Sequence, residues 1–342
     1  MERIRELDGV RAISILAVLA AHLLPLGPSQ WGLNSVSGFL GMALFFCLSG
    51  FLITSLLLRD DRAAPFLFKR IARIWPLTFV VASGAFLFGT VEADELARTI
   101  LYTRNYTVND GQGLSPFWSL CVEAHFYISI ALLIAVFRKS ALYLLPVAAV
   151  SFTGWRLYTE TFASVNTHLR IDEILSGCIL ALVITRYDWG SLSEQTKTRL
   201  SLLVYPAAAL LLATCFEPLM PLGILRPYAA AFLVGLCIVA PPTYASLILC
   251  SKPLAFIAKI SFALYAIHSL MRIGWFSEGE KWEVYLLKRP LTFALTFGLA
   301  WLSTETLEKY SNEWARRMAK KIWPPRKVTD AQASPVPVQQ VY

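Results

Sequence analysis

The chain has 342 residues, of which 56% are hydrophobic and only 16% are charged, and its mean hydropathy is +0.55. Soluble domains carry about a quarter of their residues as charged side chains, so this composition excludes an ordinary soluble protein and indicates a polytopic membrane protein. The formal net charge of +8 does not indicate a nucleic-acid partner, because Lys and Arg are spread between apolar runs rather than gathered on one basic face.

Apolar stretches recur along the chain at lengths that fit membrane-spanning helices. They are residues 12–28, 36–58, 74–90, 117–137, 140–155, 172–187, 200–216, 222–241, 254–275 and 291–306. The sequence therefore predicts an all-α fold, a polytopic membrane bundle of about ten transmembrane helices. Stretches between residues 140 and 241 are close to the shortest length that crosses the ~30 Å core of a bilayer, so the boundaries there are the weakest.

Basic residues favour one orientation of this bundle. If the N-terminus is cytoplasmic, 22 of the 31 Lys and Arg residues fall on inner segments, as the positive-inside rule requires. We therefore predict a multi-pass protein of the bacterial inner membrane with both termini in the cytoplasm. Residues 1–310 would form the transmembrane domain, and residues 311–342 a basic, partly disordered cytoplasmic tail. Residues 1–24 resemble a signal peptide, but no clean cleavage site follows them.

The first predicted span, RAISILAVLAAH (residues 11–22), holds an ionisable residue at each end. Eleven residues of α-helix make about three turns and rise about 16 Å, so Arg11 and His22 share one face at different depths. Ionisable groups at membrane depth usually face a cavity or a partner. We therefore expect both side chains to point into the bundle.

Two later residues are candidate partners or ligands in the membrane. Glu123 is expected about 8 Å below the outer surface, level with His22, where a carboxylate would orient the imidazole as a general base. The alternative is that His22 bonds a backbone carbonyl while Glu123 pairs with Arg104 or His125. His268 is a second candidate base or substrate ligand, or else a histidine satisfied within the bundle.

Charged residues also mark the two faces of the bundle. On the outer side, Arg170 and Asp172 would bind a polar acceptor or form an interfacial ion pair. On the inner side, Lys69, Arg70 and Arg73 lie in one basic loop, where guanidinium groups suit phosphate oxygens. They equally suit simple positive-inside charges beside anionic lipid. The six cysteines lack metal-ligand spacing, so we expect packing residues and no metal site.

These features fit two classes of protein. A basic inner end, a deep histidine and polar groups at the outer end suit an enzyme that joins a phosphorylated cytoplasmic donor to an acceptor outside. They also suit a polysaccharide or lipid exporter, or an ion-coupled transporter with a polar core. Inverted repeats with broken helices would favour a transporter, and the sequence contains no clear repeat.

Several motifs, in this order and spacing, resemble the membrane acyltransferase 3 family, whose members O-acylate surface carbohydrates. The segments that carry the resemblance are LDGVRAISILAVLAAH (7–22), GMALFFCLSGFLIT (41–54), KRIARIWP (69–76), WSLCVEAHFY (118–127), RIDEILSGCILA (170–181) and KISFALYAIH (259–268). Val10, Cys47, Ala263 and Ala266 depart mildly from the family pattern. Some members carry a further hydrolase-like domain; only about 36 residues follow the tenth span here, so we expect transfer to finish within the bundle.

The resemblance implies an acyl-CoA-dependent O-acyltransferase. It would move an acyl group, usually acetyl, from cytoplasmic acyl-CoA to a hydroxyl of a carbohydrate or glycolipid on the extracytoplasmic side of the membrane. We expect no metal cofactor and no nucleic-acid partner. The implied catalytic residues are His22, Glu123 and Arg11; the implied donor-binding residues are Arg70, Arg73, Lys69 and Arg11; the implied acceptor-binding residues are Arg170, Asp172, His268, Trp118 and Tyr127. Ser49 also matches a family position. Direct transfer and an acyl-histidine relay both remain open.

Overall fold

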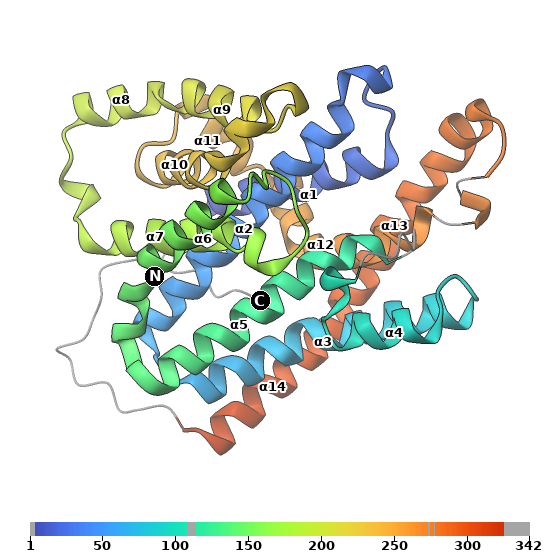
Figure 1. Ribbon diagram of the computed structural model, residues 1–342, viewed down its shortest axis with the longest axis horizontal. Coiled ribbons are helices and arrows are strands. Elements are labelled where there is room, and N and C mark those ends of the chain that lie inside the picture. The colour runs from blue at the N-terminus through green and yellow to red at the C-terminus, as the bar shows by residue number, and fades with distance from the viewer. Residues whose placement is uncertain (1–3, 108–113, 273, 277, 325–342) are drawn as a thin grey trace.

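The computed structural model describes residues 4–107, 114–272, 274–276 and 278–324, and this part of the chain contains helices and no strand (Figure 1). The α-helices are α1 (Arg5–Leu23), α2 (Leu33–Arg59), α3 (Ala63–Leu87), α4 (Ala93–Ile100), α5 (Trp118–Phe137), α6 (Leu145–Tyr158), α7 (Asp172–Arg186), α8 (Glu194–Leu202), α9 (Val204–Ala213), α10 (Arg226–Val239), α11 (Thr243–Leu249), α12 (Lys252–His268), α13 (Arg289–Ser303) and α14 (Lys309–Ile322). The all-α prediction is confirmed.

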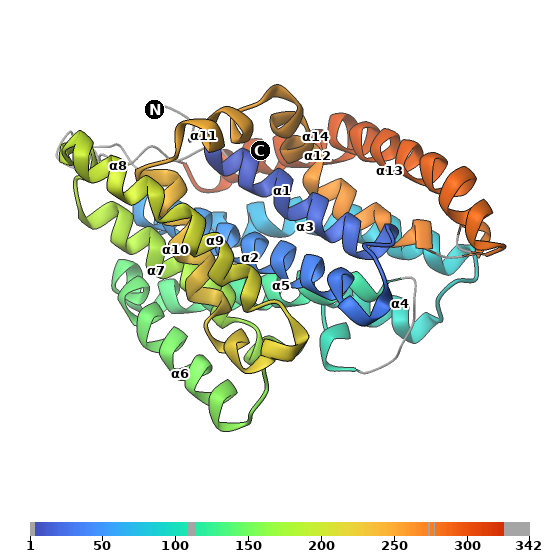
Figure 2. The ribbon, with the colours of Figure 1, turned by 90° about the horizontal axis from the view of Figure 1, so that it is seen from above.

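Helix α2 is the centre of the bundle. It packs against α1 and α7, and its residues belong to both of the buried apolar clusters. One cluster joins α2 to α1, α3, α5 and α12, and the other joins it to α7 and α10. Figure 2 shows α2 and α5 toward the middle of the bundle and α6, α8 and α13 at its edges.

Local sequence explains where the first helix ends. Helix α1 stops at Leu23, two residues before Pro25, and a second proline follows at position 28. The residue that precedes a proline is disfavoured in the helical region, and proline itself donates no backbone hydrogen bond. Asn34 at the start of α2 then donates to the carbonyl oxygens of Ala21 and Leu24 at 2.8 and 2.7 Å, which fixes α2 against the end of α1.

Three helical runs are long and apolar enough to cross a membrane. They are Leu33–Arg59, Ala63–Leu87 and Ser115–Tyr158, and two bent helix pairs raise the number to at most five in the described part of the chain. The bent pairs are Glu194–Ala213 with Glu217–Ile224, at 113°, and Arg226–Val239 with Thr243–Leu249, at 97°. The count of ten spans and the cytoplasmic termini therefore stay predictions.

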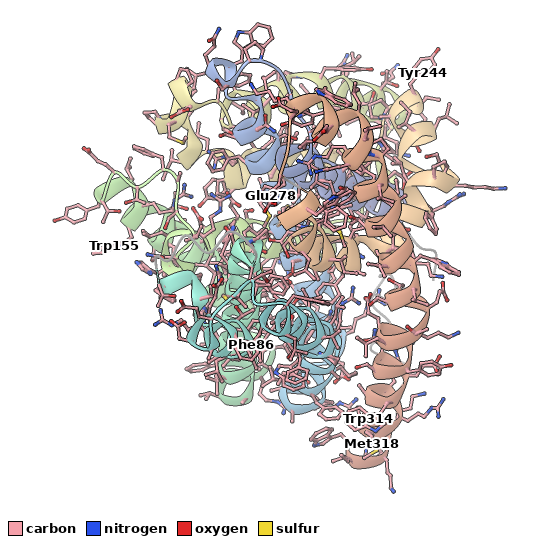
Figure 3. All side chains as sticks on the ribbon, turned by 90° about the vertical axis from the view of Figure 1, so that its right-hand side faces the viewer. Phe86, Trp155, Tyr244, Glu278, Trp314 and Met318 are labelled. Atoms are coloured by element: carbon pink, nitrogen blue, oxygen red, sulfur yellow. The ribbon has the colours of Figure 1, made fainter. Side chains whose placement is uncertain are left out.

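Large apolar side chains cover much of the outside of the bundle. Phe86, Trp155 and Trp314 are 40%, 50% and 54% exposed, and Figure 3 labels all three, with Trp155 and Trp314 near the edges of the view. Monomeric soluble proteins rarely expose apolar surface on this scale, whereas a surface that faces lipid requires it. The exposed apolar side chains thus indicate a membrane protein, as the composition does.

Part of the expected cytoplasmic tail is ordered helix. Helix α14 packs along α3, where Trp314 contacts Phe68 at a ring-centroid distance of 5.5 Å, and Ser311 donates to the carbonyl oxygen of Ala72. The remainder of the predicted tail, from residue 325, lies outside the described residues.

Candidate active site

Arg11 and His22, the two residues of α1 that the sequence singled out, line two different cavities. Arg11 lines a cavity of about 50 Å³, and His22 lines a larger pocket of about 400 Å³. We call these the arginine cavity and the histidine pocket. Both are built on α1 and α2, with α12 closing one side of each.

The arginine cavity gathers charged residues and a tyrosine from three segments that the sequence singled out. Arg11, Arg70, Arg73, Glu123 and Tyr127 all line it. The guanidinium carbon of Arg70 lies 5.9 Å from the ring centre of Tyr127. Three arginines against one glutamate make this cavity a strongly positive environment, in which an anionic ligand would be stabilised.

Glu123 lies in the arginine cavity rather than in the histidine pocket. The sequence predicted a hydrogen bond to His22, whereas in the structure Ser49 donates to Glu123 Oε1. The prediction assumed that the chain enters the membrane near Trp118, but Trp118 itself already lines the histidine pocket. Glu123, about 8 Å further along α5, lines the arginine cavity together with Arg11. Arg104 pairs with Glu95, and His125 contacts Thr167, so neither of the alternative partners takes Glu123.

Tyr127 likewise lines the arginine cavity. The sequence expected it to contact the acceptor, but it lies two helical turns below Trp118 and beside Arg70. Trp118 and Arg170, by contrast, line the histidine pocket together with His22.

His22 forms a hydrogen-bonded pair with His268. Nδ1 of His22 lies 2.9 Å from Nε2 of His268, and the two rings are nearly parallel, at 9°. His268 is fully buried, and its Nδ1 contacts the carbonyl oxygen of Tyr265. From the sequence, His268 was a candidate ligand, a candidate base or a histidine satisfied within the bundle. In the structure it is hydrogen-bonded to His22.

The proton positions in this pair follow from the carbonyl oxygen. A carbonyl only accepts hydrogen bonds, so Nδ1 of His268 carries a proton and its Nε2 holds the lone pair when the ring is neutral. That lone pair accepts Nδ1–H of His22. In neutral His22 the basic nitrogen is therefore Nε2, and the chain Tyr265–His268–His22 fixes one tautomer.

A pair of aromatic rings forms part of the partition between the two cavities. Phe45 lines the arginine cavity and Tyr265 lines the histidine pocket, and their rings stack at 6.0 Å with an angle of 9°. The hydroxyl of Tyr265 contacts Ser119 and the carbonyl oxygen of Pro116. Tyr265 is thus anchored by polar contacts, whereas Phe45 is held by packing alone.

A second cleft, of about 280 Å³, lies on the other side of Arg73. Arg73 lines both this cleft and the arginine cavity, and the remaining walls come from α12 and from the helix that ends in α14. Lys259, Lys309 and Arg316 bring positive charge to it, and Glu305, Glu308 and Glu313 bring negative charge. Lys259 is paired with Glu305. Lys69 is half-buried on α3 and is absent from the lining of both. The sequence missed Lys309 and Arg316, because their polar surroundings resembled a disordered tail.

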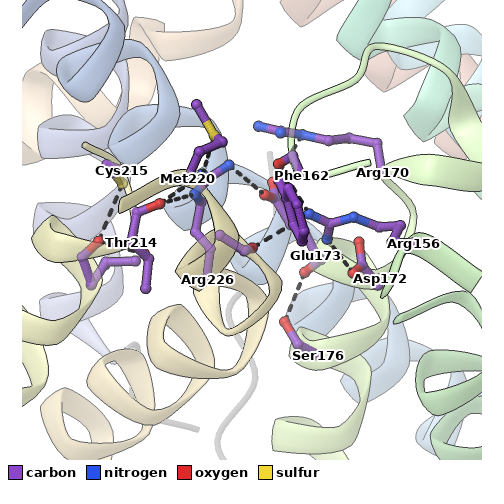
Figure 4. A network of polar contacts seen from close by, with 12 residues as sticks. Arg156, Phe162, Arg170, Asp172, Glu173, Ser176, Thr214, Cys215, Met220 and Arg226 are labelled. Carbon is purple, nitrogen blue, oxygen red and sulfur yellow. Dashed lines mark hydrogen bonds and ion pairs between the residues drawn. The ribbon is translucent and has the colours of Figure 1, made fainter. Parts of the chain in front are cut away.

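Arg170 and Asp172 lie in a buried network of five charged residues, shown in Figure 4. Arg156 pairs with Asp172. Glu173 lies 3.3 Å from Nε of Arg170 and 3.9 Å from Arg226. All five side chains are at most 2% exposed. Asp172 is thus the partner of Arg156 rather than an exposed acceptor ligand, and the expected ion pair with Arg170 is replaced by one with Glu173.

Arg156, Glu173 and Arg226 of this network were not singled out from the sequence. They lie on α6, α7 and α10, and only the fold brings them together. One signal was available, because Arg156 and Arg226 each interrupt an apolar stretch. Ionisable residues within such stretches are candidates for functional sites by default.

A family model described as an acyltransferase domain matches residues 4–305. Over 311 aligned residues the chain is 27% identical to the "Putative peptidoglycan O-acetyltransferase YrhL" of Bacillus subtilis, covering 77% of this chain and 47% of that protein. It is 26% identical to the peptidoglycan O-acetyltransferase OatA of Listeria monocytogenes, covering 77% and 48%. It is 24% identical to the O-acetyltransferase OatA of Staphylococcus aureus, covering 77% and 49%.

The chain therefore spans about half the length of the curated relatives that it matches. No solved structure matches it at a significant level.

Proposed function

Since the chain belongs to the membrane acyltransferase 3 family, we propose that it transfers an acetyl group from cytoplasmic acetyl-CoA to a hydroxyl of a surface carbohydrate. The observation that supports this most directly is the pair of cavities along α1. One end of the helix presents Arg11 among other arginines, and the other end presents a histidine with a fixed tautomer. The names of the relatives favour a peptidoglycan-like carbohydrate as the acceptor.

The donor would bind from the inner side. Arg73 lies between the cleft and the arginine cavity, so Lys309 and Arg316 in the cleft and Arg11 and Arg70 in the cavity could each meet a phosphate of coenzyme A. Guanidinium groups bind phosphate oxygens through paired hydrogen bonds. The thiol arm would then extend past Phe45 toward His22.

His22 would act as the general base in the histidine pocket. Its Nε2 takes the proton of the acceptor hydroxyl as the hydroxyl oxygen attacks the thioester carbonyl. The C–S bond breaks, and the coenzyme A thiolate leaves and takes up the proton. His268 accepts a hydrogen bond from the resulting imidazolium and so stabilises it. Alternatively, Nε2 of His22 first accepts the acetyl group and passes it to the hydroxyl.

Reconstitution in vesicles tests this function. Labelled acetyl-CoA is added to the purified protein with the disaccharide of N-acetylglucosamine and N-acetylmuramic acid, and free coenzyme A and acetylated sugar are measured. We expect both products, and we expect His22→Ala to lower the rate by at least about 10²-fold, because general-base catalysis contributes about 10²- to 10⁴-fold.

His168→Ala is the matched control. His168 is an exposed histidine that stacks on Tyr106, so the variant should insert and react like the wild type. Full activity of correctly inserted His22→Ala would remove the general base. Movement of the sugar across the vesicle membrane without release of coenzyme A would instead identify an exporter.

A further inference from the structure

The buried charge network described above is not neutral. Arg156, Arg170 and Arg226 provide three positive charges, and Asp172 and Glu173 provide two negative charges. The excess of one positive charge lies among side chains that are at most 2% exposed. An uncompensated charge in such surroundings is costly, and one additional negative charge would balance it.

The excess charge is concentrated on Arg170. Arg156 donates to the carbonyl oxygen of Phe162 at 3.2 Å, and Arg226 donates to that of Thr214 at 2.7 Å. Within the described residues, Arg170 donates no hydrogen bond that meets geometric criteria, and its charged partner Glu173 is shared with Arg226. In the described part of the chain Arg170 thus has no hydrogen bond from its side chain, whereas Arg226 leaves one nitrogen, Nη1, without a hydrogen-bond partner and bonds Thr214 with others (Figure 4).

The side-chain donors of Arg170 lie at the wall of the histidine pocket. Arg170 lines this pocket together with His22, Phe39 and Trp118. Its guanidinium carbon lies 5.5 Å from the centre of each of the two aromatic rings, so the aromatic contacts involve the flat group while its N–H donors lie along its edge. An edge with two N–H groups matches the geometry of a carboxylate or a phosphate.

We propose that the histidine pocket binds its acceptor through an oxyanion, held by the edge of Arg170. This proposal rests on the proposed function for the pocket and adds the class of acceptor. The acceptor is an acidic sugar or a sugar phosphate, whose anionic group neutralises the network while a neighbouring hydroxyl faces His22. The pocket, at about 400 Å³, has the size of sites that hold one small ligand.

Direct binding to the purified protein in detergent tests the subsite without turnover. The probes are methyl glucuronide, glucose 1-phosphate and methyl glucoside, which share a hexose ring and differ in charge. We expect at least one anionic probe to bind about 10- to 100-fold more tightly than the neutral one, as one charge-assisted contact predicts. Preference for the glucuronide alone identifies a carboxylate, and preference for the phosphate alone identifies a phosphate. Equal binding of all three overturns the proposal.

Variants at Arg170 and Glu173 test whether Arg170 causes the tighter binding of anionic probes. Arg170→Gln should reduce the ratio of anionic to neutral affinity to about one, and Arg170→Lys should keep part of it, because the charge remains while the fork is lost. Glu173→Gln should increase the ratio, because it raises the excess charge. The opposite directions of these two changes cannot both follow from misfolding.

Arg98→Gln is the matched control. Arg98 is partly exposed and pairs with Asp94 at 3.3 Å on α4, so its loss changes the net charge by the same amount away from the pocket. An equal loss of preference in Arg98→Gln and Arg170→Gln would assign the effect to the general field and overturn the subsite. Anion binding without acetyl transfer would support the subsite and contradict the proposed acetyltransferase function. Acetyl transfer without any preference for anionic probes would support that function and contradict the subsite.

Discussion

At the scale of single residues, His268 determines which nitrogen of His22 is basic. Replacing it by phenylalanine keeps an aromatic ring and removes the acceptor for Nδ1–H of His22. We expect His268→Phe to lower kcat by about 10²- to 10⁴-fold, the range of general-base catalysis, with a smaller change in KM. Steady-state acetyl transfer measures both constants.

A second substitution at position 268, one that restores a hydrogen-bond acceptor, separates positioning of His22 from packing. His268→Gln restores an oxygen at this point in the bundle and should recover part of the lost kcat. If His268→Phe instead keeps the wild-type kcat, the histidine pair has no part in positioning His22. If Gln and Phe lose equal activity, the effect belongs to the packing of α12 rather than to the tautomer.

At the scale of helices, α2 and α7 touch backbone to backbone. A Cβ atom built on Gly50 would lie 1.9 Å from the carbonyl oxygen of Ile174, and one on Gly177 would lie 1.9 Å from that of Cys47. Such close approach at small residues is typical of helix packing in membranes. Because α7 carries Asp172 and Glu173, this crossing also positions the charged network.

The crossing makes a stability prediction. Gly50→Ala forces a methyl group against backbone that cannot rotate away, so it should destabilise the protein by about 1–3 kcal/mol and lower the thermal unfolding temperature in detergent. Gly298→Ala is the control, because nothing lies within 4 Å of its Cβ position. Alanine there should be neutral or slightly stabilising. Equal behaviour of the two variants would contradict the tight crossing.

Helix-scale features divide into those that local sequence determines and those that it does not. The face shared by Arg11 and His22 follows from helix periodicity alone, and the structure places each in a cavity. The depth of Glu123 depends on how α5 is placed relative to α1, which local spacing does not encode. The order in α14 depends on contacts with α3, and these are invisible in a polar, proline-flanked segment.

At the scale of the whole molecule, the two cavities lie at opposite ends of one helix and differ in chemical character. The arginine cavity contains Arg11, Arg70 and Arg73, and the histidine pocket contains His22 and Arg170. A transferase with its substrates on opposite sides of a membrane needs both a connection for the acyl group and a barrier against water. Excluding water also prevents hydrolysis of a reactive thioester.

The stacked rings of Phe45 and Tyr265 supply part of this barrier. Because Tyr265 is anchored through Ser119 and Pro116, Phe45 is the ring that would turn aside for the donor arm. Phe45→Ala should therefore leave the partition open and raise the hydrolysis of acetyl-CoA in the absence of acceptor by about tenfold. The measurement is coenzyme A release without sugar. Phe86→Ala removes an exposed ring of the same size and should not change it. Unchanged hydrolysis in Phe45→Ala would mean that the two cavities are separated by other residues, and that the donor arm reaches His22 by another route.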